Sequence, residues 1–254
     1  MPWLTVVTVV KDDPEGFERT LKSLDQQDLD GIEFVVVDSS NDSETIPRLL
    51  SEILSSNFHV TWAKPSGIYS AMNTGLRQAQ GDYIYFLNAG DAFCDENVLR
   101  EIWAIVESVK PVWIVGRVEI FERSAATVPS RSWDYQTEKK ALFARGLFPP
   151  HQGTIVRTEA LRSVGGFNGQ FAIAADYAAA LSLSQVSTPH MTDRLIATFF
   201  EGGVSTERWQ ESFREFHRAR RLILTPRGFD SLVERFNYGK HYASVWLIRR
   251  LRRG

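Results

Sequence analysis

The first ninety residues alternate between two hydrophobic patterns. Four short runs are almost continuously apolar, which is typical of strands buried on both faces of a parallel sheet: 4–10, 32–37, 60–62 and 83–87. The segments between them place apolar residues three or four positions apart, as amphipathic helices do: 14–27, 46–54 and 71–80, the last stopped by Gly81. This alternation predicts an α/β fold with a doubly wound, Rossmann-like sheet, mostly parallel and flanked by helices.

The second half of the chain is less regular. We expect helices at 98–109, 159–164 and 177–183, strands at 113–121, 154–157 and 194–200, and a loop at 123–131. From residue 207 an amphipathic helix runs to Leu224, and after a break at Pro226–Gly228 a second helix covers 229–253, interrupted near Tyr238-Gly239. The pattern divides the chain into an α/β domain at 1–206, with halves 1–92 and 93–206, and a C-terminal helical extension at 207–254.

Composition excludes several classes of protein. Of 254 residues 43% are hydrophobic and 24% charged, as in globular domains that bury a sizeable core. The single cysteine, Cys94, excludes an intramolecular disulfide framework and a cysteine-built zinc site. No apolar run approaches the ~20 residues of a membrane-spanning helix, and a strand-like run begins almost at the first residue. We therefore expect no signal peptide and a cytoplasmic protein.

The helical extension is basic, unlike the rest of the chain. Residues 207–254 hold twelve Lys or Arg and five Asp or Glu, whereas the whole chain has a formal net charge of −2. Aromatic residues beside arginines predict peripheral binding to an anionic membrane surface, on the inner face of the cytoplasmic membrane. The alternative is that the helices pack on the body or on a second copy of the chain, as a homo-oligomer. No nucleic-acid partner is expected, because the body is acidic and no recognition motif is present.

Polar residues follow the predicted strands. Thr8 and Lys11 lie near the end of the first strand, 38–42 (DSSND) follows the second, and 88–91 (NAGD) follows the fourth. The carboxyl ends of parallel strands meet at one edge, so we expect these side chains to converge where open α/β sheets bind ligands. Carboxylates there can accept from a base or ribose, or bind a hard cation. The alternative is that Asp38 and Asp91 are only helix caps or turn formers.

Five stretches in order give the chain a resemblance to a known family. They are 65–75 (PSGIYSAMNTG), 81–93 (GDYIYFLNAGDAF), 150–152 (PHQ), 167–181 (FNGQFAIAADYAAAL) and 202–205 (GGVS). Together they resemble the family 2 glycosyltransferases of the GT-A fold, in particular the branch that builds bacterial surface polysaccharides and glycolipids. The resemblance covers about residues 3–206, and GIYxAMNxG and LNAGD are its most specific parts.

The resemblance implies a divalent metal, Mn²⁺ or Mg²⁺, bound after the fourth strand. Enzymes of this fold use the ion as a Lewis acid on the leaving diphosphate. The usual motif has two or three carboxylates, whereas this chain keeps only Asp91, with Asn88 and Gly90 at the other places. Because phosphates and waters can complete the shell of such an ion, we expect a site that is weak without nucleotide.

The resemblance also implies contacts to a nucleotide, with UDP the expected one. Thr8 and Asp38 match positions that the family uses around base and ribose, although the motif D-[DG]-[GS]-S is here 38–41 (DSSN) and Ser66 stands where an acid usually precedes GIY. Gly67 and Gly75 fit places where backbone closely approaches a helix start or the ligand. The expected nucleotide and donor contacts are Thr8, Asp38, Ser66, Gly67, Asn73, Asn88 and Ala89. For Asn73 the alternative is a helical residue bonding back to a loop.

The expected general base is Asp176, which stands where this branch carries its catalytic Asp. Inversion needs a base that takes the acceptor hydroxyl proton as the oxygen attacks the anomeric carbon. The alternative is an N-cap of the helix beginning at Tyr177. His151 and Gln152, after two prolines, are expected in the acceptor or donor-sugar pocket, unless His151 is only structural. Residues 202–205 form either a loop closing over the donor or a plain turn, and His190 is expected in a surface turn.

These features predict an inverting, hexosyltransferase-type enzyme. It moves a sugar from a nucleoside diphosphate to a hydroxyl of a saccharide or lipid-linked acceptor, in bacterial polysaccharide or glycolipid assembly. A second interpretation is a non-catalytic nucleotide-sugar-binding subunit or scaffold, favoured by the thinned carboxylate motif and opposed by Asp176. A third is a sugar nucleotidyltransferase, which is disfavoured because 11–14 (KDDP) lacks the glycines of its usual loop.

Overall fold

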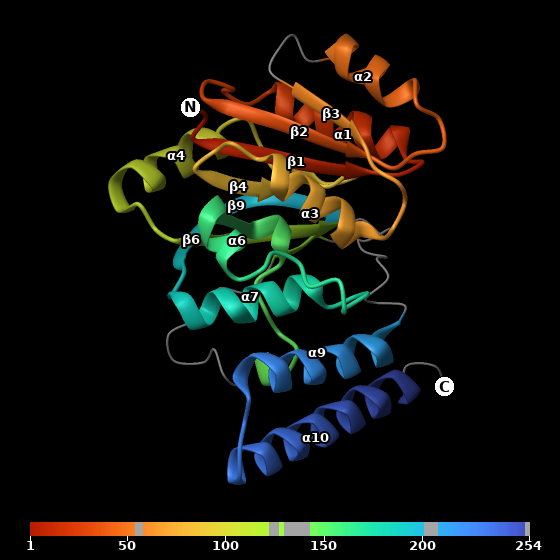
Figure 1. The fold of residues 1–254 in the computed structure, drawn as a ribbon, viewed down its shortest axis with the longest axis vertical. Helices are drawn as coiled ribbons and strands as arrows, with labels where there is room; N and C mark the ends of the chain where they lie inside the picture. The colour runs from red at the N-terminus through yellow and green to blue at the C-terminus, as the bar shows by residue number, and fades with distance from the viewer. Residues whose placement is uncertain (54–57, 122–126, 130–142, 201–207, 252–254) are drawn as a thin grey trace.

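The structure, a computed structural model, describes residues 1–53, 58–121, 127–129, 143–200 and 208–251. The described strands form one nine-stranded sheet of order β3-β2-β1-β4-β8-β6-β9-β5, with β7 paired to β6 (Figure 1). Helices flank this sheet, and two C-terminal helices extend the molecule along its longest axis. The predicted α/β fold class is therefore confirmed.

The first half follows the predicted alternation of strands and helices. Its strands pair in parallel and are β1 (Leu4–Val10), β2 (Ile32–Asp38), β3 (Phe58–Trp62) and β4 (Tyr83–Phe86). Its helices are α1 (Pro14–Asp25), α2 (Thr45–Ile53) and α3 (Ile68–Gln78). Helix α3 begins three residues earlier than predicted and therefore includes the IY pair of the GIY motif.

The second half adds antiparallel pairs to the sheet. Its elements are β5 (Ala92–Phe93), α4 (Val98–Val109), β6 (Trp113–Phe121), β7 (Thr127–Pro129), the 3-10 helix η1 (His151–Gly153), β8 (Thr154–Arg157), α6 (Thr158–Ser163), α7 (Ala175–Val186) and β9 (His190–Phe200). Strand β8 lies antiparallel to both β4 and β6, whereas β9 runs parallel to β6 and antiparallel to β5.

Three predictions about the second half were wrong. The predicted loop at 123–131 contains β7, whose β-branched Thr127 and Val128 pair antiparallel with β6. His190 does not lie in a surface turn but opens β9, because its backbone pairs with Ile114. The last helix, α10 (Phe229–Leu251), continues through Gly239, since one glycine costs a helix only about 1 kcal/mol. The predicted loop at 202–205 and the last arginines, 252–253, lie outside the described residues.

The core lies on both faces of the sheet because side chains alternate along each strand. Val7 and Val9 of β1 join a cluster with residues of α3, α6 and α7, whereas Leu4, Val6 and Val10 join a second cluster with residues of α1, α2 and α4. This two-sided burial explains why the sequence of β1 is continuously apolar. The same packing on both faces holds in place the carboxyl ends of the strands, which the polar residues follow.

The C-terminal helices extend the core instead of standing apart. Helix α9 (Trp209–Leu224) packs on α7, where the rings of Phe216 and Tyr177 lie 4.4 Å apart between centroids. Helix α10 packs on α9 through ring contacts such as His217–Tyr238, at 4.4 Å (Figure 1). Packing on the body, one of the two alternatives for the extension, therefore holds for α9. Among the described helices, none combines the length and apolar character needed to cross a bilayer.

Candidate active site

The ends of the parallel strands meet at one edge of the sheet, as predicted. The amide of Ala89 donates to the carbonyl of Val9, and that of Ser39 donates to Val10, so the segments after β4 and β2 both continue along β1. The amide of Ala63 likewise donates to the carbonyl of Asp38. These backbone bonds place the polar residues of three different segments at a common rim.

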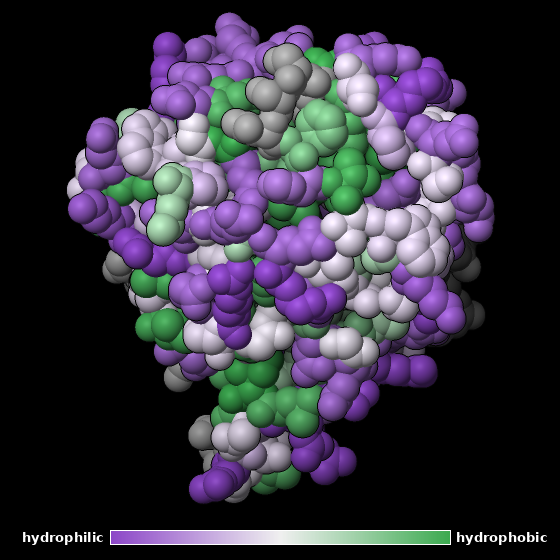
Figure 2. Space-filling model, turned by 45° about the horizontal axis from the view of Figure 1, so that its top comes forward, coloured by the Kyte–Doolittle hydropathy of each residue, from purple (hydrophilic) through white to green (hydrophobic). Residues whose placement is uncertain are grey.

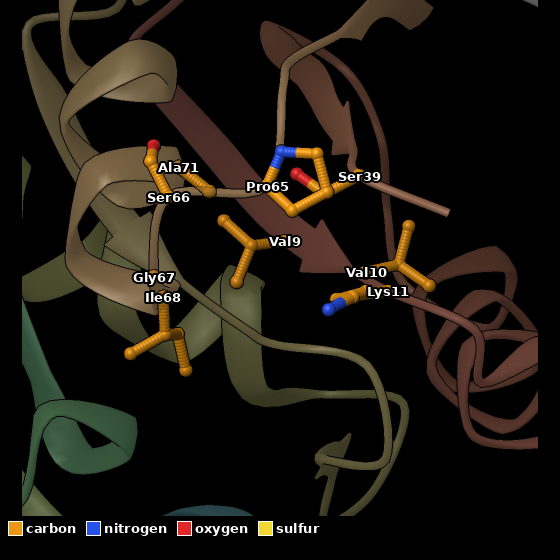
Figure 3. Close-up of a pocket in the computed structure, with 9 residues that line it drawn as sticks. All are labelled: Val9, Val10, Lys11, Ser39, Pro65, Ser66, Gly67, Ile68 and Ala71. Carbon is orange, nitrogen blue, oxygen red and sulfur yellow. The ribbon is translucent and has the colours of Figure 1, made fainter. Parts of the chain in front are cut away.

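A pocket of about 190 Å³ opens at this rim, between the ends of β1 and β2 and the first turn of α3 (Figure 3). Val9, Pro65 and Ala71 give it apolar walls, and Lys11, Ser39 and Ser66 add polar groups. Its volume is below the roughly 300–1,000 Å³ of pockets that enclose whole ligands. The pocket therefore suits one flat part of a larger ligand, with apolar faces and polar edges.

Two of the predicted contact residues line this pocket. Ser66 borders it and bonds to Ser70 over 2.7 Å, while Gly67 precedes α3 as its N-cap. Gly67 has a φ of 99°, which a residue with a Cβ rarely adopts. A Cβ built at Gly67 meets nothing within 4 Å, so the requirement for glycine is conformational and the space beside it is open.

Gly75, by contrast, is needed for packing. A Cβ at this position of α3 would lie 2.3 Å from Cγ1 of Val7 on β1. The backbone does approach a neighbour closely at Gly75, but that neighbour is a side chain of β1 and not the predicted helix start or ligand.

Thr8, Asp38 and Asn73 mainly support the rim. Thr8 is 0% exposed and donates to the carbonyl of Leu87 at 2.6 Å, so it has no free surface for a nucleotide, in contrast to the prediction. Asp38 is buried and accepts from the amide of Ser40 at 2.8 Å, the turn-forming alternative. Asn73 donates to the carbonyl of Phe167 at 2.6 Å and accepts from its amide at 2.9 Å, which is the predicted alternative of a bond to a loop.

A second group of polar side chains lies beyond the first turn of α3, around His151. One ring nitrogen of His151, Nε2, lies 3.1 Å from Nδ2 of Asn88, and the other, Nδ1, lies 3.8 Å from Oδ2 of Asp176. The opposite oxygen of Asp176 accepts from the hydroxyl of Tyr69 at 3.0 Å. The structure thus brings Asn88, His151 and Asp176 together, which the sequence placed in three separate motifs.

Tyr69 is a site residue that the sequence reasoning missed. It is the tyrosine of the GIY motif, so the motif carried the signal although only its glycine was interpreted. Burial and the neighbouring charge of Asp176 raise the pKa of the Tyr69 hydroxyl well above its ordinary value. Tyr69 therefore stays protonated and acts on Asp176 only as a hydrogen-bond donor.

Asp176 is not the N-cap of its helix. Helix α7 begins at Ala175 with Ala174 as N-cap, so Asp176 lies inside the first turn. Its side chain keeps 18% of its surface exposed, and that of His151 keeps 20%. The carboxylate is thus held from one side and open to solvent on the other, as a group that meets a bound ligand must be.

Asp91 lies at the other end of the group and is 8% exposed. Burial raises the pKa of its carboxyl to about 6, although the nearby His151 and a hydrogen bond from the side chain of Gln152 lower it. Gln152 also accepts from the hydroxyl of Tyr85 through its carbonyl, at 2.7 Å. His151 and Gln152, both in η1, thus border the carboxyl group of Asp91.

These donors fit a divalent cation only if a ligand completes its shell. The described residues hold no group of three His, Cys, Asp or Glu arranged for a metal. They do offer the Asp91 carboxylate and the Oδ1 atom of Asn88, which is buried and has no hydrogen-bond partner within the described part of the chain. Two oxygen donors suit Mg²⁺ or Mn²⁺, which take their other ligands from phosphates and water.

Comparison with known sequences identifies relatives of this chain. Residues 5–165 match the model of the family described as "Glycosyl transferase family 2". An uncharacterized glycosyltransferase of Mycobacterium tuberculosis is 27% identical over 214 residues, covering 82% of this chain and 78% of the relative. A PGL/p-HBAD biosynthesis glycosyltransferase of Mycobacterium bovis is 25% identical over 192 residues, covering 73% and 72%.

Solved structures share the fold at low sequence identity. S. aureus TarS 1–349 in complex with UDP has a TM-score of 0.67 at 19% identity, covering 87% of this chain and 66% of that one. The mannosyltransferase PcManGT from Pyrobaculum calidifontis, in complex with GDP-Man and Mn²⁺, has a TM-score of 0.61 at 16% identity, covering 98% and 75%. Against a longer TarS chain the match covers 40% of that protein.

Proposed function

The chain belongs to glycosyl transferase family 2 and is a glycosyltransferase, and from this premise we propose that it moves one sugar from a nucleoside diphosphate to an acceptor hydroxyl, with inversion. The observation that carries the proposal is the position of His151, between Asn88 at the end of β4 and Asp176 on α7. The end of this group at Asn88 suits a diphosphate, and the end at Asp176 suits a reacting hydroxyl. The first turn of α3 joins both to the pocket at the rim.

The rim pocket is proposed to hold the base of the nucleotide. Its apolar walls suit a flat ring, and Lys11 and Ser39 can meet polar edges or the first phosphate. UDP is our proposed nucleotide, since TarS, which shares the fold, was solved with UDP and with UDP-GlcNAc. PcManGT was solved with GDP-Man, so GDP is the competing choice.

Asp176 is the proposed general base. The acceptor oxygen forms a bond to the anomeric carbon while the bond from that carbon to the diphosphate oxygen breaks. The hydroxyl proton passes to the Asp176 carboxylate, and the nucleoside diphosphate leaves with the bonding electrons. Oδ1 accepts from the amide of Tyr177 at 2.7 Å and shares the proton of the Tyr69 hydroxyl with the carbonyl of Ile173, which leaves Oδ2 for the acceptor proton. The alternative of a non-catalytic binding subunit gives no reason for a partly exposed carboxylate held in this way.

Asp91 and Asn88 would hold a divalent cation together with the donor diphosphate. When bound, Mn²⁺ or Mg²⁺ supplies Lewis-acid stabilisation of the leaving group. His151 and Gln152 border the same space and limit the room for water around the diphosphate. PcManGT was solved with Mn²⁺, which supports manganese as the first ion to test.

Calorimetric titration tests the proposal first. We expect one of UDP, GDP and dTDP to bind in the presence of Mn²⁺ and to lose most of its affinity in Asp91→Ala. Asp82→Ala is the matched control, because Asp82 is an exposed carboxylate at the opposite end of β4. Absence of binding by every nucleotide, with and without Mn²⁺, would contradict the proposal.

Turnover then separates catalysis from binding. With the donor sugar identified by screening, Asp176→Asn should bind nucleotide like the wild type but lose about 10²–10⁴-fold in kcat, the usual contribution of a general base. Wild-type turnover in this variant would favour the binding subunit instead.

The acceptor is proposed to be lipid-linked and reached at a membrane surface. Leu232, Phe236 and Trp246 of α10 are 64%, 71% and 44% exposed, and helical geometry places them in one stripe. Exposed Arg235 and Lys240 flank this stripe, a pattern typical of helices that lie on anionic bilayers. Figure 2 shows hydrophobic side chains at the surface of the lower end of the molecule, where the C-terminal helices lie. One relative is a PGL/p-HBAD biosynthesis enzyme, which supports a glycolipid product.

A further inference from the structure

Helix α7, which carries Asp176, begins without a capping side chain of its own. Its N-cap is Ala174, which makes no side-chain cap bond. Glu215 of α9 instead binds the three amides just before the helix: one oxygen accepts from the amide of Ala172 at 2.9 Å, and the other from those of Ile173 and Ala174 at 2.8 and 2.9 Å. A carboxylate with three amide donors is a strong, directional contact, and its charge suits a helix N-terminus.

The peptide that Glu215 holds leads directly to Asp176. The carbonyl of Ile173 accepts from the Tyr69 hydroxyl at 2.6 Å, and the same hydroxyl lies 3.0 Å from Oδ1 of Asp176. Ile173 is therefore fixed on both sides, by Glu215 at its amide and by Tyr69 at its carbonyl. The single Tyr69 proton is shared between the Ile173 carbonyl and Asp176, so if Glu215 were lost and this peptide turned, both the place of the hydroxyl and its bond to the carboxylate would change.

Helix α9 is itself anchored, so Glu215 acts from a fixed base. The buried Arg220, one turn further along α9, donates at 3.0 Å both to the hydroxyl of Tyr177 and to the carbonyl of Phe143. Its Nε atom donates to Glu234 of α10 at 2.7 Å. Tyr177 directly follows Asp176, so α9 contacts the chain on both sides of the carboxylate.

We propose that Glu215 is a positioning residue for Asp176, and that the C-terminal helices are thereby part of the catalytic unit. Glu215 touches no substrate and exchanges no proton; it fixes the backbone at 172–174 so that the carboxylate faces the acceptor hydroxyl. The inference rests on the proposed role of Asp176 as general base.

The test compares Glu215→Gln with Glu211→Gln. Glu211 lies one turn earlier on α9 and pairs with Arg208 at the surface, which makes it a matched control. UDP binding with Mn²⁺ counts the folded, binding-competent sites in each preparation. We expect kcat per UDP site to fall about 10- to 100-fold in Glu215→Gln, because misplaced catalytic groups cost that much, while donor KM and the control stay unchanged. Equal kcat per site in Glu215→Gln and the wild type would overturn the inference.

A double-mutant cycle distinguishes positioning from general destabilisation. In an Asp176→Asn background, Glu215→Gln should cause no further loss of kcat, since there is no base left to position. A further loss of the same size would show that Glu215 acts elsewhere. If Glu215→Gln does not fold, Glu215→Asp carries the same test, because its carboxylate stands on a shorter side chain and cannot keep all three amide contacts. If the wild type binds UDP and Glu215→Gln keeps the wild-type kcat per UDP site, only the inference is refuted; a wild type that binds no nucleotide refutes the proposed function.

Discussion

The carboxyl group of Asp91 must serve two needs that oppose each other. The divalent cation that we propose for this site would favour its ionised form, whereas its burial favours the neutral form and raises its pKa from 3.8 to about 6. An acidic group this deeply buried lowers the free energy of unfolding unless a bound ligand compensates. Residues that lower stability in this way are common at binding sites, where the strain is relieved by the ligand.

The raised pKa of Asp91 predicts a pH-dependent stability in metal-free buffer. Below pH 3.8 the carboxyl is mostly protonated in both the folded and the unfolded chain, so its burial does not lower the free energy of unfolding. As the pH rises toward 6 the unfolded chain ionises freely while the folded chain resists, so the free energy of unfolding falls, by about 3 kcal/mol relative to Asp91→Asn. Urea unfolding of both proteins between pH 4 and pH 8 measures this difference, with Asp82→Asn as control. A difference that does not change with pH would contradict the prediction.

At the scale of elements, α3 connects the two parts of the site. Its first turn lines the rim pocket with Gly67 and Ile68 and supports Asp176 with Tyr69. The distance between α3 and the sheet is set by Gly75, which lies against Val7 of β1. A change in the separation of helix and sheet therefore affects both the rim pocket and the support of Asp176.

Two glycine-to-alanine changes test this packing. Gly75→Ala should destabilise the protein by about 1–3 kcal/mol, because the new Cβ would lie 2.3 Å from Val7 and overpack the interface. Gly239→Ala in α10 is the matched control: a Cβ there meets nothing within 4 Å, so it should stabilise by about 0.5–1 kcal/mol through helix propensity alone. Denaturant unfolding of both variants gives the comparison, and a stabilising Gly75→Ala would refute the close contact.

Local pattern predicted the elements well and the contacts between them poorly. The boundaries of β1, α4, β6 and β8 follow from hydrophobic periodicity, because each is decided by its own residues. Strand β7 and the first residues of β9 were missed because they exist through pairing with β6, which local sequence does not encode. The motifs identified Asp91, His151 and Asp176. The burial of Thr8, the contact of Tyr69 with Asp176 and the contact of Glu215 with residues 172–174 were not predicted, because they depend on long-range packing.

At the scale of the whole molecule, the basic C-terminal helices lie at one end, where α10 exposes the apolar side chains of Leu232, Phe236 and Trp246. The body is acidic and would be repelled by an anionic surface, so binding would orient the molecule with its C-terminal helices toward that surface. Because α9 contacts both the segment of Asp176 and α10, the helix that we propose to face the membrane is joined to that segment.

Binding to vesicles tests this orientation. The protein should sediment with vesicles that contain phosphatidylglycerol and less with neutral phosphatidylcholine vesicles, and added salt should weaken the binding. Phe236→Ser should reduce the affinity at least about tenfold, since burial of such a side chain contributes roughly 1.5–3 kcal/mol. Val109→Ser, which changes an exposed apolar residue at the end of α4, should have no effect. Equal binding to both lipids would contradict the proposal.

The order of strands in the sheet also has a consequence for synthesis on the ribosome. Strand β4 is complete at Phe86, but its antiparallel partner β8 ends at Arg157. At about 5–20 residues per second, the edge of β4 stays unpaired for roughly 4–14 s after it emerges. During that time the nascent chain presents an apolar strand edge to its surroundings, and we expect a chaperone that shields this edge to raise the yield of folded protein.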